Sequence, residues 1–302
     1  MNNRMIITGA SGFVGGTFAI YFSQHGFEVT GVSINKVHGA SYPVRTITYQ
    51  VEEVVKLVNE LQPSFLIHAA GSASVGESVI NPARDFSNSV ALFRTVLEGV
   101  RLSGQKPVVV FPSSAAVYGN PETLPVKETA ALNPISPYGF HKVMCEQLAR
   151  EYSVCFNIPT LALRLFSVFG PRQKRLLVWE LFRQFRSASQ VLVEGTGNES
   201  RDYLSVDDLA AALAKLLAVV HNGHTVVNMG SGRSVTVREM AELIKVITHS
   251  PKDILYQGMV RPGNPMNWKA DISYWQKLIG NNININFDEA LKSCLDTWSS
   301  EK

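Results

Sequence analysis

The stretch "TGASGFVGG", residues 8–16, follows directly after an apolar run that begins at Met5. Its glycines form a TGxxGxxG pattern between a predicted strand and a predicted helix, a context that separates a ligand-binding loop from an ordinary turn. The first glycine of such a loop permits a tight turn, the second lets a pyrophosphate approach the backbone, and the third lets the helix pack on the strand. The helix N-terminus then offers unpaired N–H groups to the phosphates. The loop residues predicted to hold a dinucleotide are Gly9, Gly12, Phe13, Val14 and Gly15.

Short apolar runs alternate with helical patterns through the first half of the chain, which predicts parallel strands joined by crossover helices in a doubly wound α/β sheet. The predicted strands are Met5–Thr8, Val29–Ser33, Val44–Tyr49, Phe65–Ala70, Val108–Ser113 and Thr160–Ser167. The predicted helices are Phe13–His25, Val51–Leu61, Ala83–Ser103 and Pro137–Phe156. The elements become shorter after residue 170. We therefore expect a dinucleotide-binding domain over 1–170 and a smaller α/β lobe over 171–302, whose segments can be interleaved.

Composition excludes several classes of protein. With 45% hydrophobic and 18% charged residues, the chain is not a disordered one. The net charge is +3 and the basic residues are scattered, so no nucleic-acid partner is expected. No apolar run approaches the roughly 18 residues of a membrane helix, so no membrane partner is expected either. Three widely spaced cysteines, Cys145, Cys155 and Cys294, predict free thiols in the cytoplasm rather than a disulfide framework or a zinc site.

The end of the second predicted strand lacks a residue that dinucleotide-binding loops usually have. An acidic residue about 20 positions after the glycines ordinarily binds the adenosine ribose. Here the strand ends in Ser33, followed by Asn35 and Lys36. Their side chains can donate to a 2′-phosphate and neutralise it, although a lysine on a loop is equally often only solvated. The sequence therefore predicts NAD or NADP as the cofactor and leans slightly to NADP.

A second constellation joins the fifth predicted strand to the helix that begins at Pro137. The strand closes in "FPSSAAVYG", with Ser113 and Ser114, and the helix opens in "SPYGFHK", with Tyr138 and Lys142. Because Tyr138 and Lys142 are four residues apart, they share one face of the first helical turns. A tyrosine normally ionises at a pKa of about 10, but a neighbouring ammonium and a cationic nicotinamide both favour the phenolate.

A phenolate of this kind can serve as a general base toward an alcohol or as a general acid toward a ketone. Lys142 can also hold the nicotinamide ribose, and Ser114 can donate a hydrogen bond to the substrate oxygen. The chemistry predicted from these residues is hydride transfer at a carbinol carbon. A tyrosine and a lysine at this spacing also occur by chance on many helices, so the prediction depends on the strand-end serines and on the glycine loop that precedes them.

At this point the sequence resembles the extended short-chain dehydrogenase/reductase family, which contains sugar-nucleotide epimerases, dehydratases and 4-ketoreductases. The resemblance covers nearly the whole chain and is carried by the glycine loop, "IHAAG" (67–71), "VGESVINP" (75–82), "PSSAAVYG" (112–119), "SPYGFHK", "LRLFSVFGPRQ" (163–173), "GTGNESRDYLSVDDLA" (195–210) and "RPGNP" (261–265). Within the family, the segments around residues 68 and 114 are most similar to UDP-glucose 4-epimerases. The resemblance implies a Rossmann-type cofactor domain and a smaller C-terminal lobe that binds a nucleotide-diphosphate sugar.

The resemblance also implies roles for individual residues. Ser114, Tyr138 and Lys142 would be the catalytic trio. The further residues that would contact the cofactor are Ala69, Ala70, Gly71 and Ser113. The residues that would contact the substrate, together with Ser114, are Ser167, Val191, Arg201 and Arg261. The two arginines would bind the pyrophosphate, and Val191 would lie on the strand that receives the base.

Two departures from the family pattern bear on activity. Ser167 stands where family members usually carry an asparagine that contacts substrate, which puts sugar or pyrophosphate recognition there in doubt. Ala115 and Ala116 stand where 4,6-dehydratases carry an Asp-Glu pair. Eliminating water from a sugar requires a base at one carbon and an acid at the departing hydroxyl, and two methyl groups supply neither. Dehydratase activity is therefore not expected.

The readings that remain are a 4-epimerase, a 4-ketoreductase and a sensor without catalytic activity. An epimerase returns the hydride to the other face of the 4-keto sugar, whereas a reductase consumes NADPH on a 4-keto-6-deoxy sugar nucleotide. Overall likeness favours the epimerase, and the loop that begins at Ser33 favours the reductase. A sensor is disfavoured because the whole catalytic trio is present. A homodimer is also expected, because Ala83–Ser103 and the Tyr138 helix are apolar on more than one face, and the corresponding helices pair in this family.

Overall fold

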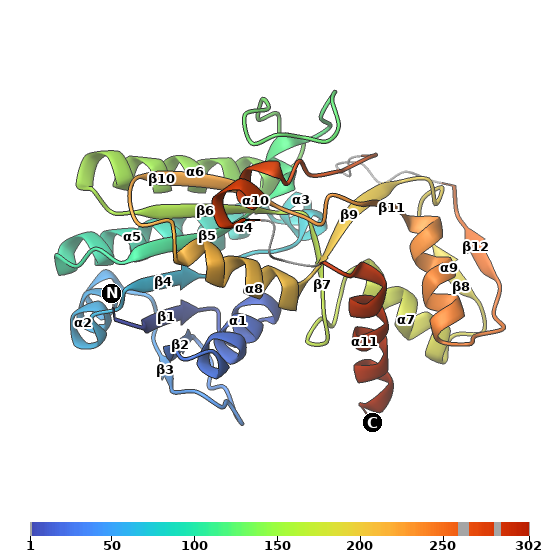
Figure 1. The fold of residues 1–302 in the computed structure, drawn as a ribbon, viewed down its shortest axis with the longest axis horizontal. Coiled ribbons are helices and arrows are strands. Elements are labelled where there is room, and N and C mark those ends of the chain that lie inside the picture. Colours follow the sequence, from blue (N-terminus) through green and yellow to red (C-terminus); the bar gives the residue numbers. More distant parts are fainter. Residues whose placement is uncertain (1, 259–265, 281–284, 302) are drawn as a thin grey trace.

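The computed structural model describes residues 2–258, 266–280 and 285–301. At the centre of this part of the chain lies a parallel sheet of seven strands in the order β10-β6-β5-β4-β1-β2-β3 (Figure 1). The strands are β1 (Arg4–Thr8), β2 (Glu28–Ser33), β3 (Val44–Thr46), β4 (Phe65–His68), β5 (Val108–Ser114), β6 (Thr160–Leu165) and β10 (His224–Met229). The predicted doubly wound α/β fold is confirmed.

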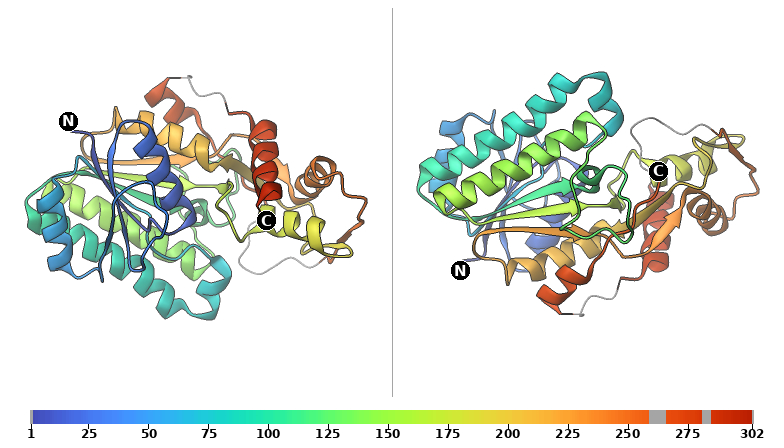
Figure 2. Two further views of the ribbon diagram at one scale, coloured as in Figure 1. Left: turned by 90° about the horizontal axis from the view of Figure 1, so that it is seen from below. Right: turned by 90° about the horizontal axis from the view of Figure 1, so that it is seen from above.

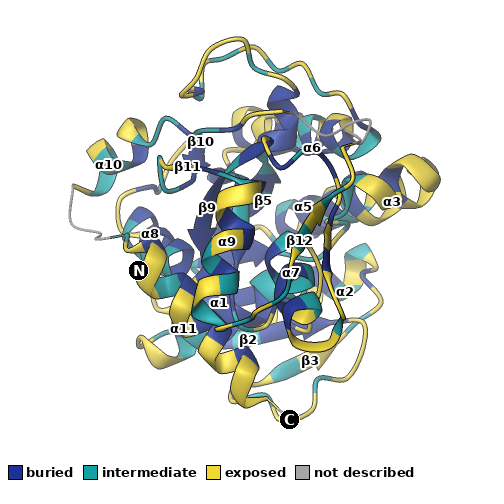
Figure 3. Cartoon of the chain, turned by 90° about the vertical axis from the view of Figure 1, so that its right-hand side faces the viewer, coloured by how far each residue is buried: buried dark blue, intermediate teal, exposed yellow. Residues whose placement is uncertain are grey.

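The first strand shows why the sheet is buried on both faces. Met5 and Ile7 point into the core on one side of the sheet, and Ile6 points into the core on the other. All three side chains are at most 1% exposed. A strand of a parallel sheet that is covered on both faces is apolar at every position rather than at alternate ones, which is the pattern of the other inner strands as well. Figure 3 shows these strands buried beneath helices whose outer faces are exposed.

Helices cover the sheet on its two faces (Figure 2). The helices packed on one face are α1 (Phe13–Gln24), α8 (Val206–Leu217) and α10 (Ser273–Ile279). The helices packed on the other face are α2 (Val51–Leu61), α5 (Leu92–Ser103) and α6 (Pro137–Phe156). The carboxyl ends of β1, β4 and β5 therefore meet at one edge of the sheet, which is where ligands bind in folds of this type.

One predicted helix is divided in the structure. The expected single helix over Ala83–Ser103 begins as α4 (Pro82–Phe86), passes through a π-helical turn at Ser87–Ala91 and continues as α5. A π-helical turn fits one extra residue into a helix, and such turns occur frequently at functional sites. Here the Asn88 carbonyl lies 3.0 Å from the position that a Cβ would take at Gly71. The predicted helix over Ala83–Ser103 is therefore confirmed, with a π-helical turn inside it.

The second lobe consists of small sheets and helices beyond β6. Its strands are β7 (Ser167–Phe169), β8 (Val191–Val193), β9 (Ser200–Ser205), β11 (Ser234–Thr236) and β12 (Ile254–Tyr256). Its helices are α7 (Leu177–Ser187), α9 (Val237–Ile247) and α11 (Phe287–Ser300). The strands form a three-stranded sheet, β11-β9-β7, and a two-stranded sheet, β12-β8. Between these segments the chain returns to the large sheet through α8 and β10. Within the described ranges, no helix is long and apolar enough to cross a membrane.

Candidate active site

The glycine loop is built so that side chains are excluded from it. Gly9 has a φ of +68°, a conformation that L-residues other than glycine rarely adopt. A Cβ at Gly9 would lie 2.6 Å from the Ala69 carbonyl, and one at Gly15 would lie 2.4 Å from the Gly9 carbonyl oxygen. The Gly12 N–H donates to the same oxygen at 2.9 Å. The first N–H groups of α1 thus face an open cradle of backbone, which fits the pyrophosphate of a dinucleotide.

The segment after β4 is fixed against this loop. The Thr8 hydroxyl is hydrogen-bonded to His68 Nδ1 at 2.9 Å and accepts the Ala70 N–H at 3.2 Å. Burial, together with the charge of Lys142, lowers the pKa of His68 to about 3, so the imidazole is neutral at physiological pH. Gly71 follows with a φ of +134°. The structure therefore places the predicted cofactor residues at 69–71 beside Gly9, at the carboxyl ends of β4 and β1.

Ser33 ends β2 with its side chain almost fully buried. Its hydroxyl donates to Ser11 Oγ at 3.0 Å and accepts the Asn35 N–H at 3.2 Å, whereas Lys36 is exposed to solvent. The hydroxyl of Ser33 is thus joined to the glycine loop, and no carboxylate ends this strand. Sequence reasoning missed Ser11, although its position inside the glycine loop was the signal that it faces the same ligand.

The predicted serines lie where β5 turns into a short 3₁₀ helix, η2 (Ala115–Tyr118). Ser114 is half-buried and accepts the Ala116 N–H on its hydroxyl at 3.2 Å. Ser113 is buried and donates to Glu146 Oε1 at 2.6 Å. Ala115 and Ala116 are also buried. Because their side chains are methyl groups, they offer neither an acid nor a base to a ligand.

The first turn of α6 lies directly against η2. Ser136 caps the helix by accepting the Gly139 N–H at 3.2 Å, and Pro137 occupies the first helical position. A Cβ at Gly139 would lie 2.6 Å from the Ala116 carbonyl oxygen, so a larger residue there would push the helix away. The Tyr138 N–H donates to Ser78 Oγ of α3 (Val75–Ile80) at 3.0 Å. The structure therefore brings the start of α6 to the strand-end serines, as the sequence predicted.

Lys142 lies beneath Tyr138 with its ammonium largely removed from water. Its side chain is 7% exposed and its Nζ donates to the Pro112 carbonyl at 3.0 Å. The same Nζ lies 5.5 Å from the ring centroid of Tyr138 and 4.6 Å from that of Phe111. The structure therefore places a phenol and a buried ammonium together in the first turns of α6.

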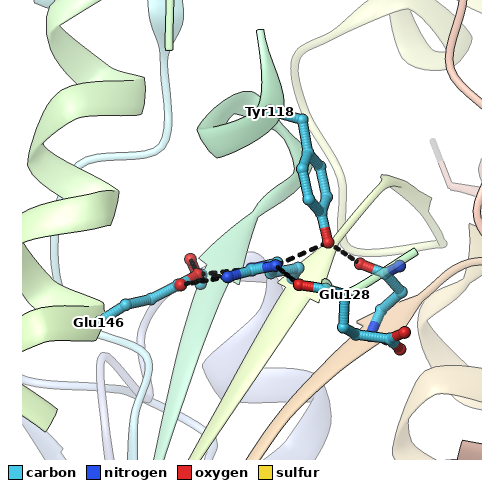
Figure 4. A network of polar contacts seen from close by, with 6 residues as sticks. Tyr118, Glu128 and Glu146 are labelled. Atoms are coloured by element: carbon cyan, nitrogen blue, oxygen red, sulfur yellow. Dashed lines mark hydrogen bonds and ion pairs between the residues drawn. The ribbon is translucent and has the colours of Figure 1, made fainter. Parts of the chain in front are cut away.

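A buried polar network joins β6 to α6 and to η2 (Figure 4). Arg164 of β6 binds the Glu146 carboxylate through Nε and Nη2, the shortest contact being 2.8 Å, and its Nη1 donates to the Tyr118 hydroxyl at 2.8 Å. The Tyr118 hydroxyl donates in turn to Asn228 Oδ1 at 2.6 Å. Nη1 also donates to the backbone carbonyl of Glu128. Sequence reasoning missed the network. Its one local signal was Glu146, a second charged residue on the face of α6 that carries Lys142, which lies four positions before it.

A second buried pair joins α6 to α4 on the side away from the serines. His141 Nδ1 and Asp85 Oδ2 are 2.5 Å apart, and the Phe86 ring packs edge-on against the imidazole at 5.5 Å. Asp85 and His141 were not predicted as part of the site, because the residues are 56 positions apart and neither belongs to a recognisable motif. The pair adds to the Ser78 contact in holding α3 and α4 to the start of the catalytic helix.

The second lobe holds Arg201, one of the two arginines predicted to bind the pyrophosphate, on β9. Arg201 on β9 donates to the Ser200 and Met266 carbonyls, and its guanidinium lies 5.2 Å from the ring centre of Trp268. Burial lowers the pKa of Arg201, and the opposing effects of Tyr203 and Glu199 do not offset it. Trp268 Nε1 donates to the Gly119 carbonyl at 3.1 Å, which joins this segment to η2.

The other predicted substrate residues are placed differently. Ser167 begins β7 opposite Tyr203 and is half-buried. Val191 begins β8 with its side chain fully buried in the core of the lobe, so any contact it makes with a ligand would come from its backbone. Arg261 lies outside the residues that the structure describes.

Comparison with known proteins adds a family to this geometry. The sequence profile of the NAD dependent epimerase/dehydratase family matches residues 5–230. The UDP-glucose 4-epimerase of Streptomyces lividans is 30% identical over 277 residues, covering 83% of each protein. The structure of UDP-glucose 4-epimerase with UDP-glucose from Thermotoga maritima is similar at a TM-score of 0.90, with 26% identity and 98% of each chain covered. The UDP-glucose 4-epimerase from Brucella ovis in complex with NAD has a TM-score of 0.86 and 26% identity, covering 98% of this chain and 97% of the other.

Proposed function

This chain belongs to the NAD dependent epimerase/dehydratase family, and we propose that it is a 4-epimerase of a UDP-linked hexose. The observation that carries the proposal is the buried Lys142 against the Tyr138 ring, in a helix that packs on β5 and η2 where Ser114 lies. The names of the relatives support a UDP-hexose as the substrate.

Each member of the trio has a distinct task in this proposal. Tyr138, with Lys142 beneath its ring, takes the proton from the 4-hydroxyl and returns it after the sugar has turned. Ser114 donates its hydroxyl proton in a hydrogen bond to the same sugar oxygen. Lys142 stabilises the phenolate and holds the nicotinamide ribose. When bound, NAD accepts the hydride from carbon 4 and gives it back to the opposite face.

The division of labour between the two lobes follows from the same proposal. The domain over residues 1–170 holds the cofactor through the glycine loop, Ser113 and the segment at 69–71. The lobe over 171–302 holds the nucleotide diphosphate. Its proposed anchors are Arg201, whose guanidinium is held by two carbonyls, and Arg261, and its further proposed contacts are Ser167 and the backbone at Val191. Paired guanidinium groups suit a doubly charged pyrophosphate.

Cofactor choice is proposed from two observations that favour different answers. The family description and the NAD-bound relative support NAD(H) as the resident cofactor. The strand end at Ser33 has no carboxylate to repel a 2′-phosphate, and the exposed Lys36 lies three residues away. NADP(H) therefore remains the alternative cofactor, and a 4-ketoreductase of a 4-keto-6-deoxy sugar nucleotide remains the alternative function. The presence of Ala115 and Ala116 still argues against dehydration.

The proposed assembly is a homodimer formed through α3, α4 and α6. Large apolar side chains are exposed on these helices, with Ile80 at 85%, Val79 at 58% and Phe140 at 52% exposure. Phe86 and Met144 are exposed on the same helices. A second copy of the chain would cover these side chains, and exposed apolar clusters of this kind mark protein interfaces. The three free thiols support a reducing compartment, so we place the protein in the cytoplasm.

The replacement Tyr138→Phe tests the proposal, because it removes the ionisable oxygen and leaves the ring in place. Conversion of UDP-glucose to UDP-galactose should fall by at least a hundredfold, while NAD binding and thermal stability change little. Phe140→Tyr, two residues away on the exposed face of the same helix, is the matched control and should leave turnover unchanged. Near-normal turnover in Tyr138→Phe would remove this residue from the mechanism.

A further inference from the structure

Two buried residues of opposite charge lie one turn apart on α6, yet they do not pair. Lys142 and Glu146 are four residues apart, a spacing at which lysine and glutamate side chains on a helix normally attract each other. Both are buried, at 7% and 3% exposure. Nevertheless, Lys142 Nζ donates to the Pro112 carbonyl and Glu146 accepts from Ser113, two adjacent residues of β5. Something in the structure must hold the carboxylate away from the ammonium.

Arg164 supplies that competing interaction. Its Nε and Nη2 take both oxygens of Glu146, at 3.0 Å and 2.8 Å, in the two-pronged geometry that a guanidinium forms with a carboxylate. Its Nη1 is anchored on the Tyr118 hydroxyl and the Glu128 carbonyl, at 2.8 Å and 2.9 Å. Burial alone would lower the pKa of Arg164, but the hydrogen bonds and charge of Glu146 outweigh it and raise the pKa. The guanidinium is therefore a fixed positive charge that occupies the carboxylate.

We propose that Arg164 is a positioning residue that keeps Glu146 away from Lys142, so that the Lys142 ammonium stays free to act on Tyr138 and the nicotinamide ribose. The inference deepens the proposed function and rests on it, because it assumes that Tyr138 is the proton-transfer group. Without Arg164, the carboxylate lies one helical turn from the ammonium and has no other cation of this network to bind.

The other titratable groups around Lys142 do not substitute for this arrangement. His68 of β4 is neutral, because burial and the charge of Lys142 lower its pKa to about 3. Cys145 of α6 is also neutral, because burial raises its pKa to about 12. Asp85 of α4 is already bonded to His141. On η2, Tyr118 is uncharged as well, since burial raises its pKa to about 12. The charge beneath Tyr138 therefore depends on whether the Glu146 carboxylate pairs with Arg164 or with Lys142.

The test measures the ionisation of Tyr138 in the NAD-loaded protein, by the ultraviolet absorbance of its phenolate. The signal of each protein is corrected by the same protein carrying Tyr138→Phe. Arg164→Met should move the midpoint of the Tyr138 phenolate titration to higher pH by about one unit or more, because Glu146 then neutralises Lys142. Glu146→Gln should move it in the opposite direction, because the Arg164 charge is no longer compensated. The double variant Arg164→Met/Glu146→Gln should return it close to the wild-type midpoint.

Arg101→Met is the matched control, because Arg101 pairs with Glu98 near the surface of α5 and should leave the midpoint unchanged. Equal midpoints in the wild type, Arg164→Met and Glu146→Gln would overturn the proposal, as would shifts in the same direction. If Arg164→Met does not fold, an unchanged or raised midpoint in Glu146→Gln overturns it alone. The titration needs no substrate, so its failure is distinguishable from a failure of the proposed epimerase activity, which the wild-type turnover assay reports.

Discussion

The glycine loop and the Arg164 network both hold the catalytic edge of the sheet in place, but they do so by different means. In the loop, the backbone comes so close to itself that a Cβ at Gly9 would lie 2.6 Å from the Ala69 carbonyl. In the network, charged and hydroxyl-bearing side chains from β5, α6 and β6 bind one another in the protein interior, with the side chains of Glu146 and Arg164 both at most 5% exposed. The loop can form only because its glycines have no Cβ atoms. The network is stable only when all of its charged groups are present.

The difference predicts how each region responds to mutation. An added methyl group in the loop collides with backbone that cannot move away, and no second substitution nearby relieves the collision. Removing one charge from the network leaves its partner buried and unpaired, and removal of that partner relieves the cost. Compensation by a second mutation is therefore the property that distinguishes the two regions.

The largest expected effect is on the stability of the network. Arg164→Met should lower the free energy of unfolding by about 3 kcal/mol, because the buried Glu146 carboxylate loses its two-pronged contact with the guanidinium and a contact with Lys142 restores only part of it. The double variant Arg164→Met/Glu146→Gln should be more stable than Arg164→Met alone, although it carries one more substitution. Denaturant unfolding of the two single variants and the double variant measures this. A double variant whose loss equals the sum of the single losses would show that the charges are independent.

The next effect is on the loop, where Gly9→Ala should weaken NAD binding and stability together. The positive φ alone costs about 1–2 kcal/mol for a residue with a Cβ, and the collision with Ala69 adds to it. Gly26→Ala is the matched control, because Gly26 also has a positive φ, +82°, but nothing lies within 4 Å of its Cβ position. Calorimetric titration with NAD and thermal unfolding should show larger losses of NAD affinity and of stability for Gly9→Ala than for Gly26→Ala. Equal losses in the two variants would mean that the close approach to Ala69 is unimportant.

A smaller effect is expected at the strand end beside the loop. Ser33→Asp introduces a carboxylate that repels a 2′-phosphate and binds a 2′-hydroxyl, so the preference should swing from NADP(H) toward NAD(H) by about 2 kcal/mol. Lys36→Ala serves as the companion variant, and it should weaken NADP(H) while leaving NAD(H) binding unchanged. Titration of both cofactors against the three proteins measures the swing. An unchanged preference in Ser33→Asp would place recognition of the ribose elsewhere.

The smallest effect concerns Glu128, which borders the network. Burial raises the pKa of this carboxyl, so ionisation favours the unfolded chain. The resulting loss of stability is absent below the ordinary pKa of a glutamate, develops as pH rises from there to the raised folded value, and persists above it. Glu128→Gln keeps an oxygen that can accept the Asn228 N–H and should remove this loss. Its stability relative to the wild type should increase as the pH rises from 4 to 7, because only the wild type has a carboxyl whose ionisation favours the unfolded chain. A constant difference across this range would contradict the raised pKa.

Local patterns in the sequence were sufficient to predict the strands, the glycine loop and the Tyr138 helix. Each element is indicated by a pattern within a few neighbouring residues. The strands are continuous apolar runs, the loop has its glycine spacing, and the helix has a proline after the N-capping Ser136. The position of Tyr138 and Lys142 near the end of β5 was predictable for the same reason, because the two residues are one turn apart on α6, which packs on β5.

The network and the division of the helix over Ala83–Ser103 were not predictable in this way. Glu146 and Arg164 are 18 residues apart, and Tyr118 and Asn228 are 110 apart, so their contacts exist only once the sheet has formed. The π-helical turn at Ser87–Ala91 depends on one extra residue whose presence leaves the apolar pattern almost unchanged. The hydrogen bond from Ser33 to Ser11 is likewise a result of how β2 ends against the loop.

The central claim is that this protein moves a hydride away from carbon 4 of a UDP-hexose and returns it to the same carbon. The most direct measurement uses UDP-galactose that carries deuterium at carbon 4 and follows the UDP-glucose formed by nuclear magnetic resonance. The account predicts UDP-glucose with the deuterium retained at carbon 4, formed without net consumption of NAD(H) or NADP(H). Failure to form UDP-glucose, loss of the deuterium from carbon 4, or consumption of one reduced cofactor for each sugar converted would contradict it.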